Sequence, residues 1–320
     1  MTLRRSRDVP TLVAAARDGD PRAVARLISL VEDGDTALPD IAAALAPHTG
    51  RAAVIGLTGA PGVGKSTTTN ELVAAYRKVG RRVGVLAVDP SSPFTGGAIL
   101  GDRVRMQDHA TDPGVYIRSM SSRGHLGGLS AATPQAARVL DGAGCDPVLI
   151  ETVGVGQAEV EIAGLADTTV VLLAPGMGDA IQAAKAGVLE TADVFVVNKA
   201  DRDGADATYR DIQGMIGLGD RAPGEWRPRV VRCVAARAEG IGELVDAVDA
   251  HRSHLVTSGA LAARRVRRAE AEVEAIALGT LRARMQDLRT GDTLSTLARE
   301  VAEGRLDPYT AADTLLARLS

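Results

Sequence analysis

An eight-residue stretch, GAPGVGKS at 59–66, limits the possible folds of this 320-residue chain more than any other feature. It matches the pattern G-x-x-x-x-G-K-[ST] without a mismatch, and it follows the apolar run AVIGLT at 53–58. In such a loop the glycines let the backbone curl until its N–H groups surround phosphate oxygens, and the following helix adds the positive end of its dipole. The sequence therefore predicts a phosphate-binding loop between a strand and a helix that starts near Lys65.

The residue types in this loop predict specific contacts with a nucleotide. The ammonium group of Lys65 should reach the β- and γ-phosphates, and the hydroxyl group of Ser66 should supply a ligand to Mg²⁺. An ordinary glycine-rich turn is the alternative, and the apolar run before the loop argues against it. The expected nucleotide-contacting residues are Gly59, Ala60, Pro61, Gly62, Val63, Gly64, Lys65, Ser66 and Thr67.

Seven apolar stretches rich in β-branched residues alternate with helical segments from residue 53 onward. Continuous apolar strands separated by helices are typical of a parallel sheet covered on both faces. The predicted fold class is α/β: a P-loop NTPase with a mostly parallel central sheet flanked by helices, plus N-terminal helices and a C-terminal helical arm. The stretches are AVIGLT at 53–58, VGVLAVD at 83–89, VYIRSM at 115–120, PVLIETV at 147–153, TTVVLLAP at 168–175, VFVVNKAD at 194–201 and RVVRCVAA at 229–236.

The two ends of the chain differ in character from the sheet region. At the amino end, the stretches 21–34 and 38–50 space apolar residues at helical intervals. At the carboxyl end, RRVRRAEAEVEAIALGTLRARM at 264–285 is charged, rich in alanine and helical in its period. We expect three parts, which are an N-terminal helical extension over 1–50, a P-loop domain over 51–255 and a C-terminal helical arm over 256–320.

The tetrapeptide NKAD at 198–201 indicates which base the nucleotide carries. The carboxylate of Asp201 can accept hydrogen bonds from the N–H groups on the edge of guanine, whereas adenine offers no such pair. A site built on hydrogen bonds of this kind can discriminate by roughly 10⁴-fold or more. Asn198 should brace the loop, and the stem of Lys199 should cover the base. A chance turn is the alternative, and the position of NKAD downstream of a phosphate-binding loop favours guanine.

A second base-contacting loop is expected at VAAR, residues 234–237. Its backbone N–H groups are suited to the carbonyl oxygen of guanine. The contacting residues are expected to be Ala235, Ala236 and Arg237.

Acidic residues at or after the ends of other apolar stretches are candidate ligands of Mg²⁺. A carboxylate beyond a phosphate-binding loop binds this hard cation directly or through one of the waters it keeps. The N–H group of Gly154 can contact the γ-phosphate and lose that contact on hydrolysis. A helix cap or a surface charge is the alternative for each acid. The expected metal ligands are Ser66, Asp89, Asp102 and Glu151, and the expected catalytic residues are Lys65, Asp102, Glu151 and Gly154.

The composition argues against nucleic-acid and membrane partners and indicates the cellular compartment. The formal net charge is −3 and only 2% of residues are aromatic, so neither a basic field nor stacking platforms favour nucleic acid. Cys145 and Cys233 lie far apart in the sequence, which is consistent with a reducing cytoplasm. The first apolar run is cut short by charges and no run approaches the length of a membrane span. We therefore expect a cytoplasmic protein without a membrane partner.

Six stretches of the sequence are together more specific than a generic P-loop. They are TGAPGVGKST, VDPSSPFTGGAILGDRVRM, RSMSSRGHLGGL, ETVGVGQAEVE, APGMGDAIQAAKAG and VVNKAD. In combination they resemble the MeaB/ArgK family, whose members are GTPases of the SIMIBI class. The resemblance is strong from near residue 10 to near residue 255, and it covers the C-terminal arm by general character.

The resemblance implies a Mg²⁺-dependent GTPase that serves as a chaperone of another enzyme. Family members gate the delivery of adenosylcobalamin to methylmalonyl-CoA mutase and protect that mutase from inactivation. The resemblance also implies a homodimer joined partly through the C-terminal arm, with a cobalamin adenosyltransferase as a further candidate partner. In GMGDAIQAAK at 176–185, it implies a switch loop in which Asp179 and Lys185 report the nucleotide state to the mutase.

Two positions depart from the pattern of the family. Ala158 in GQAE replaces the serine of the commoner GQSE, which weakens any role for a hydroxyl group there. The second base loop often carries serine before alanine, whereas this chain has Ala235 there. A backbone contact with the base survives this change, but a contact made by a hydroxyl group does not.

Other functions stay open at the level of the sequence. A kinase acting on a periplasmic arginine/ornithine-binding protein needs an acceptor site and a catalytic base, and the sequence displays neither. A nickel-insertion GTPase shares the fold class, but such proteins tend to carry a His-rich segment or a Cys-containing metal motif, which this sequence lacks. A nucleotide switch that does not hydrolyse GTP is the last alternative, because no residue is an unambiguous hydrolytic base.

Overall fold

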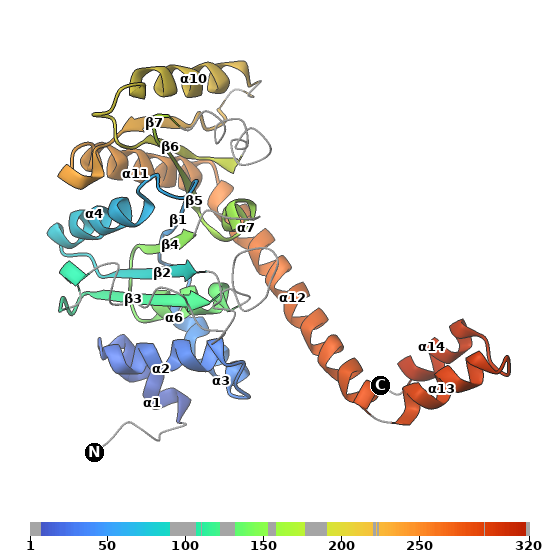
Figure 1. Cartoon of the computed structure of the whole chain (residues 1–320). Helices are drawn as coiled ribbons and strands as arrows, with labels where there is room; N and C mark the ends of the chain where they lie inside the picture. The colour runs from blue at the N-terminus through green and yellow to red at the C-terminus, as the bar shows by residue number, and fades with distance from the viewer. Residues whose placement is uncertain are drawn as a thin grey trace. The chain divides into compact units, whose positions relative to one another are not determined.

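The centre of the molecule is a parallel sheet (Figure 1). The computed structural model describes residues 8–89, 107–109, 111–121, 132–152, 158–176, 191–219, 222, 224–290 and 292–317. Within these residues the seven strands lie in the order β3-β2-β4-β1-β5-β6-β7, and all neighbours run parallel. They are β1 (Val54–Thr58), β2 (Val83–Asp89), β3 (Val115–Ser121), β4 (Val148–Thr152), β5 (Thr168–Leu173), β6 (Val194–Val197) and β7 (Arg229–Arg232). Each coincides with one of the predicted apolar stretches, which confirms the predicted α/β fold class.

Helices cover both faces of the sheet, which explains why the inner strands β1, β4, β5 and β6 are buried along almost their whole length. Successive side chains of a strand point to opposite faces. In β5, Val170 and Leu172 join a core with α4 and α11, whereas Val171 and Leu173 pack on α10. On the latter face, α6 and α7 cover β2 and β4. The bounds of these helices are α4 (Lys65–Lys78), α6 (Thr133–Gly142), α7 (Ala158–Leu165), α10 (Ala205–Leu218) and α11 (Ile241–Thr257).

The N-terminal helices add a layer against α6. The side chains of Leu27 and Ile28 are buried in the same core as Leu140 of α6. The first turn of α2 is capped by Asp20, whose carboxylate accepts the N–H group of Arg22 at 2.8 Å. These helices share one compact unit, residues 1–262, with the sheet. They are α1 (Val9–Arg17), α2 (Pro21–Glu32) and α3 (Leu38–Leu45), followed by the short 3₁₀ helix η2 (Ala46–His48).

Residues 263–320 form a second compact unit. It contains most of α12 (Ala260–Thr290), together with α13 (Asp292–Ala302) and α14 (Pro308–Leu316), which pack against each other. The long helix α12 includes the stretch 264–285 for which a helical period was predicted. Several large apolar side chains of α12 are exposed, among them Val266, Val273 and Ile276.

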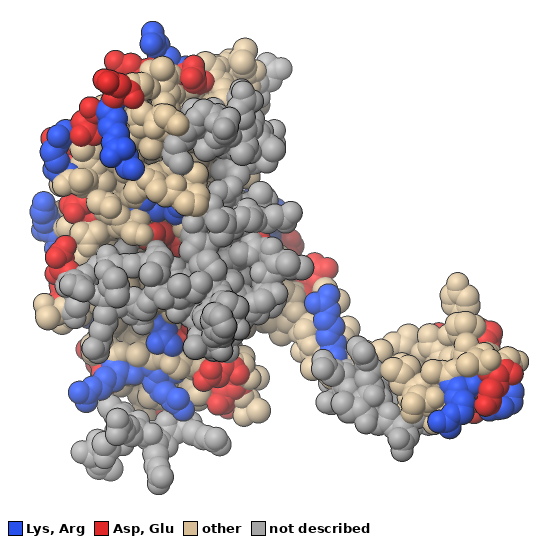
Figure 2. Space-filling view, in the orientation of Figure 1, with Lys and Arg blue, Asp and Glu red and all other residues tan. Residues whose placement is uncertain are grey.

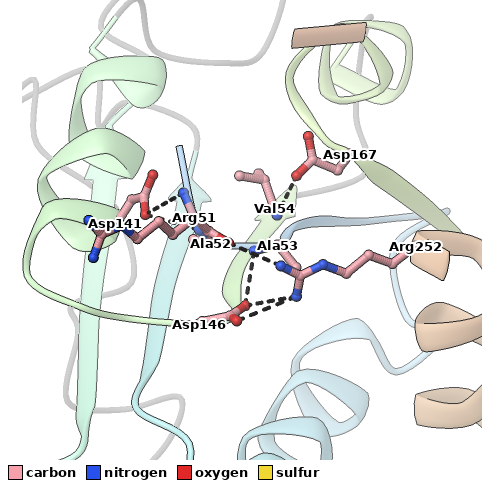
Figure 3. Close-up of polar contacts among 8 residues, drawn as sticks. All are labelled: Arg51, Ala52, Ala53, Val54, Asp141, Asp146, Asp167 and Arg252. Atoms are coloured by element: carbon pink, nitrogen blue, oxygen red, sulfur yellow. Dashed lines mark hydrogen bonds and ion pairs between the residues drawn. The ribbon is translucent and has the colours of Figure 1, made fainter. Parts of the chain in front are cut away.

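Three aspartates anchor the chain where it enters β1 (Figure 3). The carboxylates of Asp141, Asp146 and Asp167 accept hydrogen bonds from consecutive main-chain N–H groups, which are those of Gly50, Arg51, Ala52, Ala53 and Val54. The guanidinium group of Arg252, on α11, donates to Asp146 at 3.2 Å and to the carbonyl oxygen of Arg51 at 3.0 Å. Because these charged acceptors replace water at the amino end of β1, they fix the strand that carries the phosphate-binding loop at its other end.

Replacing Asp141 by alanine tests how much this anchor stabilises the protein. The variant removes the acceptor of three N–H groups, including that of the buried residue Ala52. We expect a loss of about 2 kcal/mol in the free energy of unfolding, because hydrogen bonds to a charged acceptor are among the stronger ones. The measurement is urea unfolding followed by circular dichroism. The exposed Asp211→Ala, on α10, is the control, and equal unfolding curves for the two variants would contradict the anchoring role.

Candidate nucleotide-binding site

The predicted phosphate-binding loop lies at the carboxyl end of β1 and leads directly into α4. β1 pairs with β4 on one side and with β5 on the other, so strands β2–β4 lie on one side of β1 and β5–β7 on the other, and the strand order reverses here. In open parallel sheets, ligands bind outside the carboxyl ends of the strands at such a switch point. The fold therefore presents the loop where a ligand site is expected.

Two glycines of the loop are required by their surroundings. Gly59 has a φ of +141°, and a Cβ atom there would lie 2.3 Å from the carbonyl oxygen of Leu172. Gly64 has a φ of +97°, and a Cβ atom there would lie 2.3 Å from Nδ2 of Asn198. Because other residues neither adopt these angles easily nor fit these spaces, the loop depends on glycine at both positions.

The ammonium group of Lys65 folds back over the loop. Its Nζ atom donates to the carbonyl oxygens of Gly59 at 2.7 Å and of Ala60 at 3.0 Å. The side chain is only 7% exposed, although lysine is rarely buried. The positive charge is therefore held inside the loop that a phosphate group would enter.

Ser66 lies beside a buried carboxylate from β4. Its hydroxyl group donates to Oε1 of Glu151 at 2.5 Å, and Glu151 is 2% exposed. The next residue of β4, Thr152, donates its hydroxyl group to that of Thr58 at 3.0 Å, across the carboxyl ends of β4 and β1. The sequence interpretation missed this threonine pair, although each residue ends a strand at the same edge of the sheet.

Asn198, which follows β6, connects the two halves of the site. Its Nδ2 atom donates to the carbonyl oxygen of Val63 in the phosphate-binding loop at 2.8 Å. Its Oδ1 atom accepts the N–H group of Ala235 in the second base loop at 3.1 Å. The side chain is 3% exposed, so a buried amide links three segments that are distant in sequence.

The side chain of Lys199, the second residue of NKAD, reaches the phosphate-binding loop. Its Nζ atom donates to the carbonyl oxygen of Gly62 at 2.6 Å. The backbone at Lys199 is left-handed, with a φ of +55°, which is uncommon for a residue other than glycine. Such strain tends to persist at functional sites, where surrounding contacts maintain it.

Asp201 is the most exposed member of the tetrapeptide, and its side chain is 39% accessible. Nη1 of Arg237 lies 3.6 Å from its Oδ2 atom. Arg237 belongs to the 3₁₀ helix η4 (Ala235–Arg237), which forms the predicted second base loop. The structure thus brings the two predicted base-contacting segments together.

Main-chain hydrogen bonds of Cys233 also connect the tetrapeptide NKAD with the second base loop. Its N–H group donates to the carbonyl oxygen of Val197 at 2.9 Å, and its carbonyl oxygen accepts the N–H group of Ala200 at 3.0 Å. Burial, reinforced by the nearby negative charge of Glu243, raises the pKa of the Cys233 thiol to about 12. The thiol is therefore protonated at neutral pH and is a packing group rather than a nucleophile.

Several predicted site residues lie outside the described residues. These are Asp102, Gly154, Asp179 and Lys185. Asp89 ends β2 at the same edge of the sheet, but its side chain is likewise outside the description. Their predicted roles stay predictions.

The surface carries charges of both signs. On the face drawn in Figure 2, basic and acidic side chains of the described residues are interspersed. In the part of the chain that the structure describes, no helix combines the length and the apolar character that a bilayer crossing needs.

Comparisons with known proteins agree on one family. The family model described as "Methylmalonyl Co-A mutase-associated GTPase MeaB" matches residues 24–289. A putative GTPase of Pyrococcus abyssi is 47% identical over 310 residues, which cover 96% of each chain. The mouse mitochondrial methylmalonic aciduria type A homolog is 37% identical over 266 residues, covering 82% of this chain and 64% of the mouse protein.

A solved structure agrees with the fold over the whole chain. The crystal structure of an LAO/AO transport system kinase superposes with a TM-score of 0.70 and 26% identity, covering 99% of each chain. The matches bear out the resemblance that the six sequence stretches carried. The chain is a GTPase with the P-loop fold, and it belongs to the MeaB family.

Proposed function

We propose that this GTPase is a chaperone that gates the delivery of adenosylcobalamin to methylmalonyl-CoA mutase and protects that mutase. The observation that carries the proposal is the match to the family of mutase-associated GTPases over residues 24–289. The contacts of Asn198 and Lys199 with the phosphate-binding loop support a site in which base and phosphates are bound together.

In the proposed complex, GTP lies along the carboxyl edge of the sheet. Backbone N–H groups of residues 59–66 surround the phosphates, and Lys65 offsets their charge. The carboxylate of Asp201 accepts the N–H groups of guanine, while a backbone N–H group of the loop 235–237 donates to the guanine oxygen. Lys199 covers the base with its stem and keeps its ammonium group on Gly62.

The residues near Ser66 fit a magnesium ion. Mg²⁺ prefers oxygen ligands and keeps several waters, and the hydroxyl group of Ser66 adjoins the buried carboxylate of Glu151. These two side chains would hold the ion together with phosphate oxygens, and Asp89 and Asp102 are further proposed ligands. Bound there, Mg²⁺ supplies positive charge against the charge that develops on the phosphates during hydrolysis. Among the described residues, no group of three or more His, Cys, Asp or Glu side chains forms a metal site of its own.

The helical arm is proposed to join two copies of the chain. The side chains of Val266, Val273 and Ile276 are 56%, 67% and 51% exposed on α12, at spacings of seven and three residues. Apolar residues at this spacing form the seam of paired helices. A cobalamin adenosyltransferase remains a second proposed partner, since an enzyme of this class supplies the cofactor.

The proposed partnership predicts that the mutase raises the rate of GTP hydrolysis. A switch can be biased only by a partner that binds its two states differently. We therefore expect purified methylmalonyl-CoA mutase to accelerate GTP turnover by the wild-type protein. Asp179→Ala and Lys185→Ala should lower the ratio of stimulated to intrinsic turnover, because these side chains are proposed to report the nucleotide state. The measurement is phosphate release with and without the mutase.

Two outcomes would count against this proposal. If the mutase leaves wild-type turnover unchanged, the chaperone function is wrong, whereas equal stimulation of all three proteins would overturn only the switch role of Asp179 and Lys185. Glu270→Ala, on an exposed part of α12, is a control for the loss of a surface charge.

A further inference from the structure

The side chain of Arg237 lies next to the carboxylate of Asp201, a contact that the predicted backbone role of the second base loop does not include. The guanidinium group of Arg237 lies with Nη1 3.6 Å from Oδ2 of Asp201. Glu239 holds the other side of the same group, since its Oε1 atom lies 2.9 Å from Nε and its Oε2 atom accepts from Nη2 at 3.2 Å. The planar fork of arginine suits this two-point contact with a carboxylate and leaves Nη1 for Asp201.

The backbone of the loop places these side chains together. Ala238 adopts a left-handed conformation with a φ of +56°, which turns the chain sharply after Arg237. The turn is closed by reciprocal hydrogen bonds between Val234 and Glu239, at 3.0 and 3.3 Å. Because Ala235 is tied to Asn198, the closed turn is fixed relative to the tetrapeptide that contains Asp201.

We propose that Arg237, positioned by Glu239, orients the carboxylate of Asp201 for two-point recognition of guanine. The proposal rests on the guanine site proposed above. Arg237 is thus a positioning residue that contributes to base specificity through Asp201.

The solvent exposure of Arg237, Glu239 and Asp201 determines whether their ion pairs affect the free protein or the nucleotide complex. The side chains of Arg237, Glu239 and Asp201 are 53%, 58% and 39% exposed, so water and salt screen their ion pairs in the free protein. A bound base covers the carboxylate and excludes water from it, which strengthens the attraction to the guanidinium group. Arg237 therefore acts mainly on nucleotide binding and only weakly on the stability of the fold.

The inference is tested by comparing GDP with inosine diphosphate, which lacks the 2-amino group of guanine. An oriented carboxylate gains two hydrogen bonds from GDP and one from inosine diphosphate. We expect Arg237→Ala to raise the Kd of GDP by about tenfold and the Kd of inosine diphosphate by less than about threefold. The preference for GDP should therefore fall. Glu239→Gln should also lower the preference for GDP over inosine diphosphate, by a smaller factor. Arg202 is an exposed arginine next to Asp201 in sequence, and Arg202→Ala should leave this preference unchanged.

The possible results distinguish a failure of the role proposed for Arg237 from a failure of the proposed guanine site. If Arg237→Ala weakens both nucleotides equally, Arg237 supports only the shape of the loop, and if it tightens GDP, Arg237 blocks the site; either result overturns the inference. An unchanged preference in Glu239→Gln would overturn the positioning role of Glu239. A wild-type protein that does not distinguish GDP from ADP would instead refute the proposed guanine site.

Discussion

Lys65→Ala is expected to lower GTP turnover at saturating nucleotide by at least about 100-fold, because electrostatic stabilisation is the main lever in phosphoryl transfer. The ammonium group of Lys65 is held inside the loop by the carbonyl oxygens of Gly59 and Ala60. It therefore needs little rearrangement to meet the β- and γ-phosphates of a bound nucleotide. The affinity for GTP should also fall, since the same charge offsets the triphosphate in the ground state. Phosphate release measured over a range of GTP concentrations gives both quantities.

The control for Lys65 lies on the same helix. Lys78→Ala removes an exposed lysine at the other end of α4 and should leave turnover unchanged. Lys65→Ala also leaves the two carbonyl oxygens without this donor, so we expect a modest loss of stability, about 1 kcal/mol. Thermal unfolding checks that the variant is folded at the temperature of the assay. A folded Lys65→Ala protein with wild-type turnover would show that hydrolysis does not take place at this loop.

The strands could be predicted from sequence because helices cover both faces of the sheet. Such strands have no polar side, so Val83–Asp89 and Thr168–Leu173 appear as continuous apolar runs. Helices with a regular apolar period, such as Pro21–Glu32, were likewise visible. The packing of this helix against α6 could not be predicted, because its partner is more than 100 residues away in the chain and nothing in the pattern names it.

The candidate site was predictable where a motif has a fixed spacing. The stretch 59–66 and the tetrapeptide 198–201 were recognised because their residue types must stand at set positions along the chain. The contacts between them depend on tertiary structure instead. The bond from Asn198 to Val63 joins residues 135 positions apart, and no local pattern reveals it.

The residues that the sequence interpretation missed share one property. Thr58, Glu239 and Asp141 are ordinary polar residues near the ends of strands or helices, where turns and caps also use them. Only the three-dimensional structure shows that Thr152 donates a hydrogen bond to Thr58 and that Arg237 donates one to Glu239. It also shows that Asp141 accepts main-chain N–H groups just before β1. Polar contacts between distant segments are therefore the part of the site that a single sequence does not disclose.

Asp201→Asn is expected to change which base the protein prefers. The carboxylate of Asp201 presents only acceptors to the N–H groups of guanine, whereas an asparagine amide turns one of them into a donor. Xanthine carries an oxygen where guanine carries its 2-amino group, so the amide complements xanthine. A site that leaves polar groups unsatisfied rejects the wrong ligand by roughly 10⁴-fold or more, and a reversal of preference of about 100-fold or more is therefore expected. The exposed Asp203→Asn, in the same loop, is the control and should keep the preference for guanine.

Competition binding of GDP, xanthosine diphosphate and ADP to the wild-type protein and to Asp201→Asn tests the guanine site most directly. The wild-type protein should bind GDP at least about 100-fold more tightly than the other two nucleotides, and Asp201→Asn should prefer xanthosine diphosphate. Equal affinities of the wild-type protein for GDP and ADP would contradict a guanine site at Asp201. A GDP preference that is unchanged in Asp201→Asn would show that the base is recognised elsewhere.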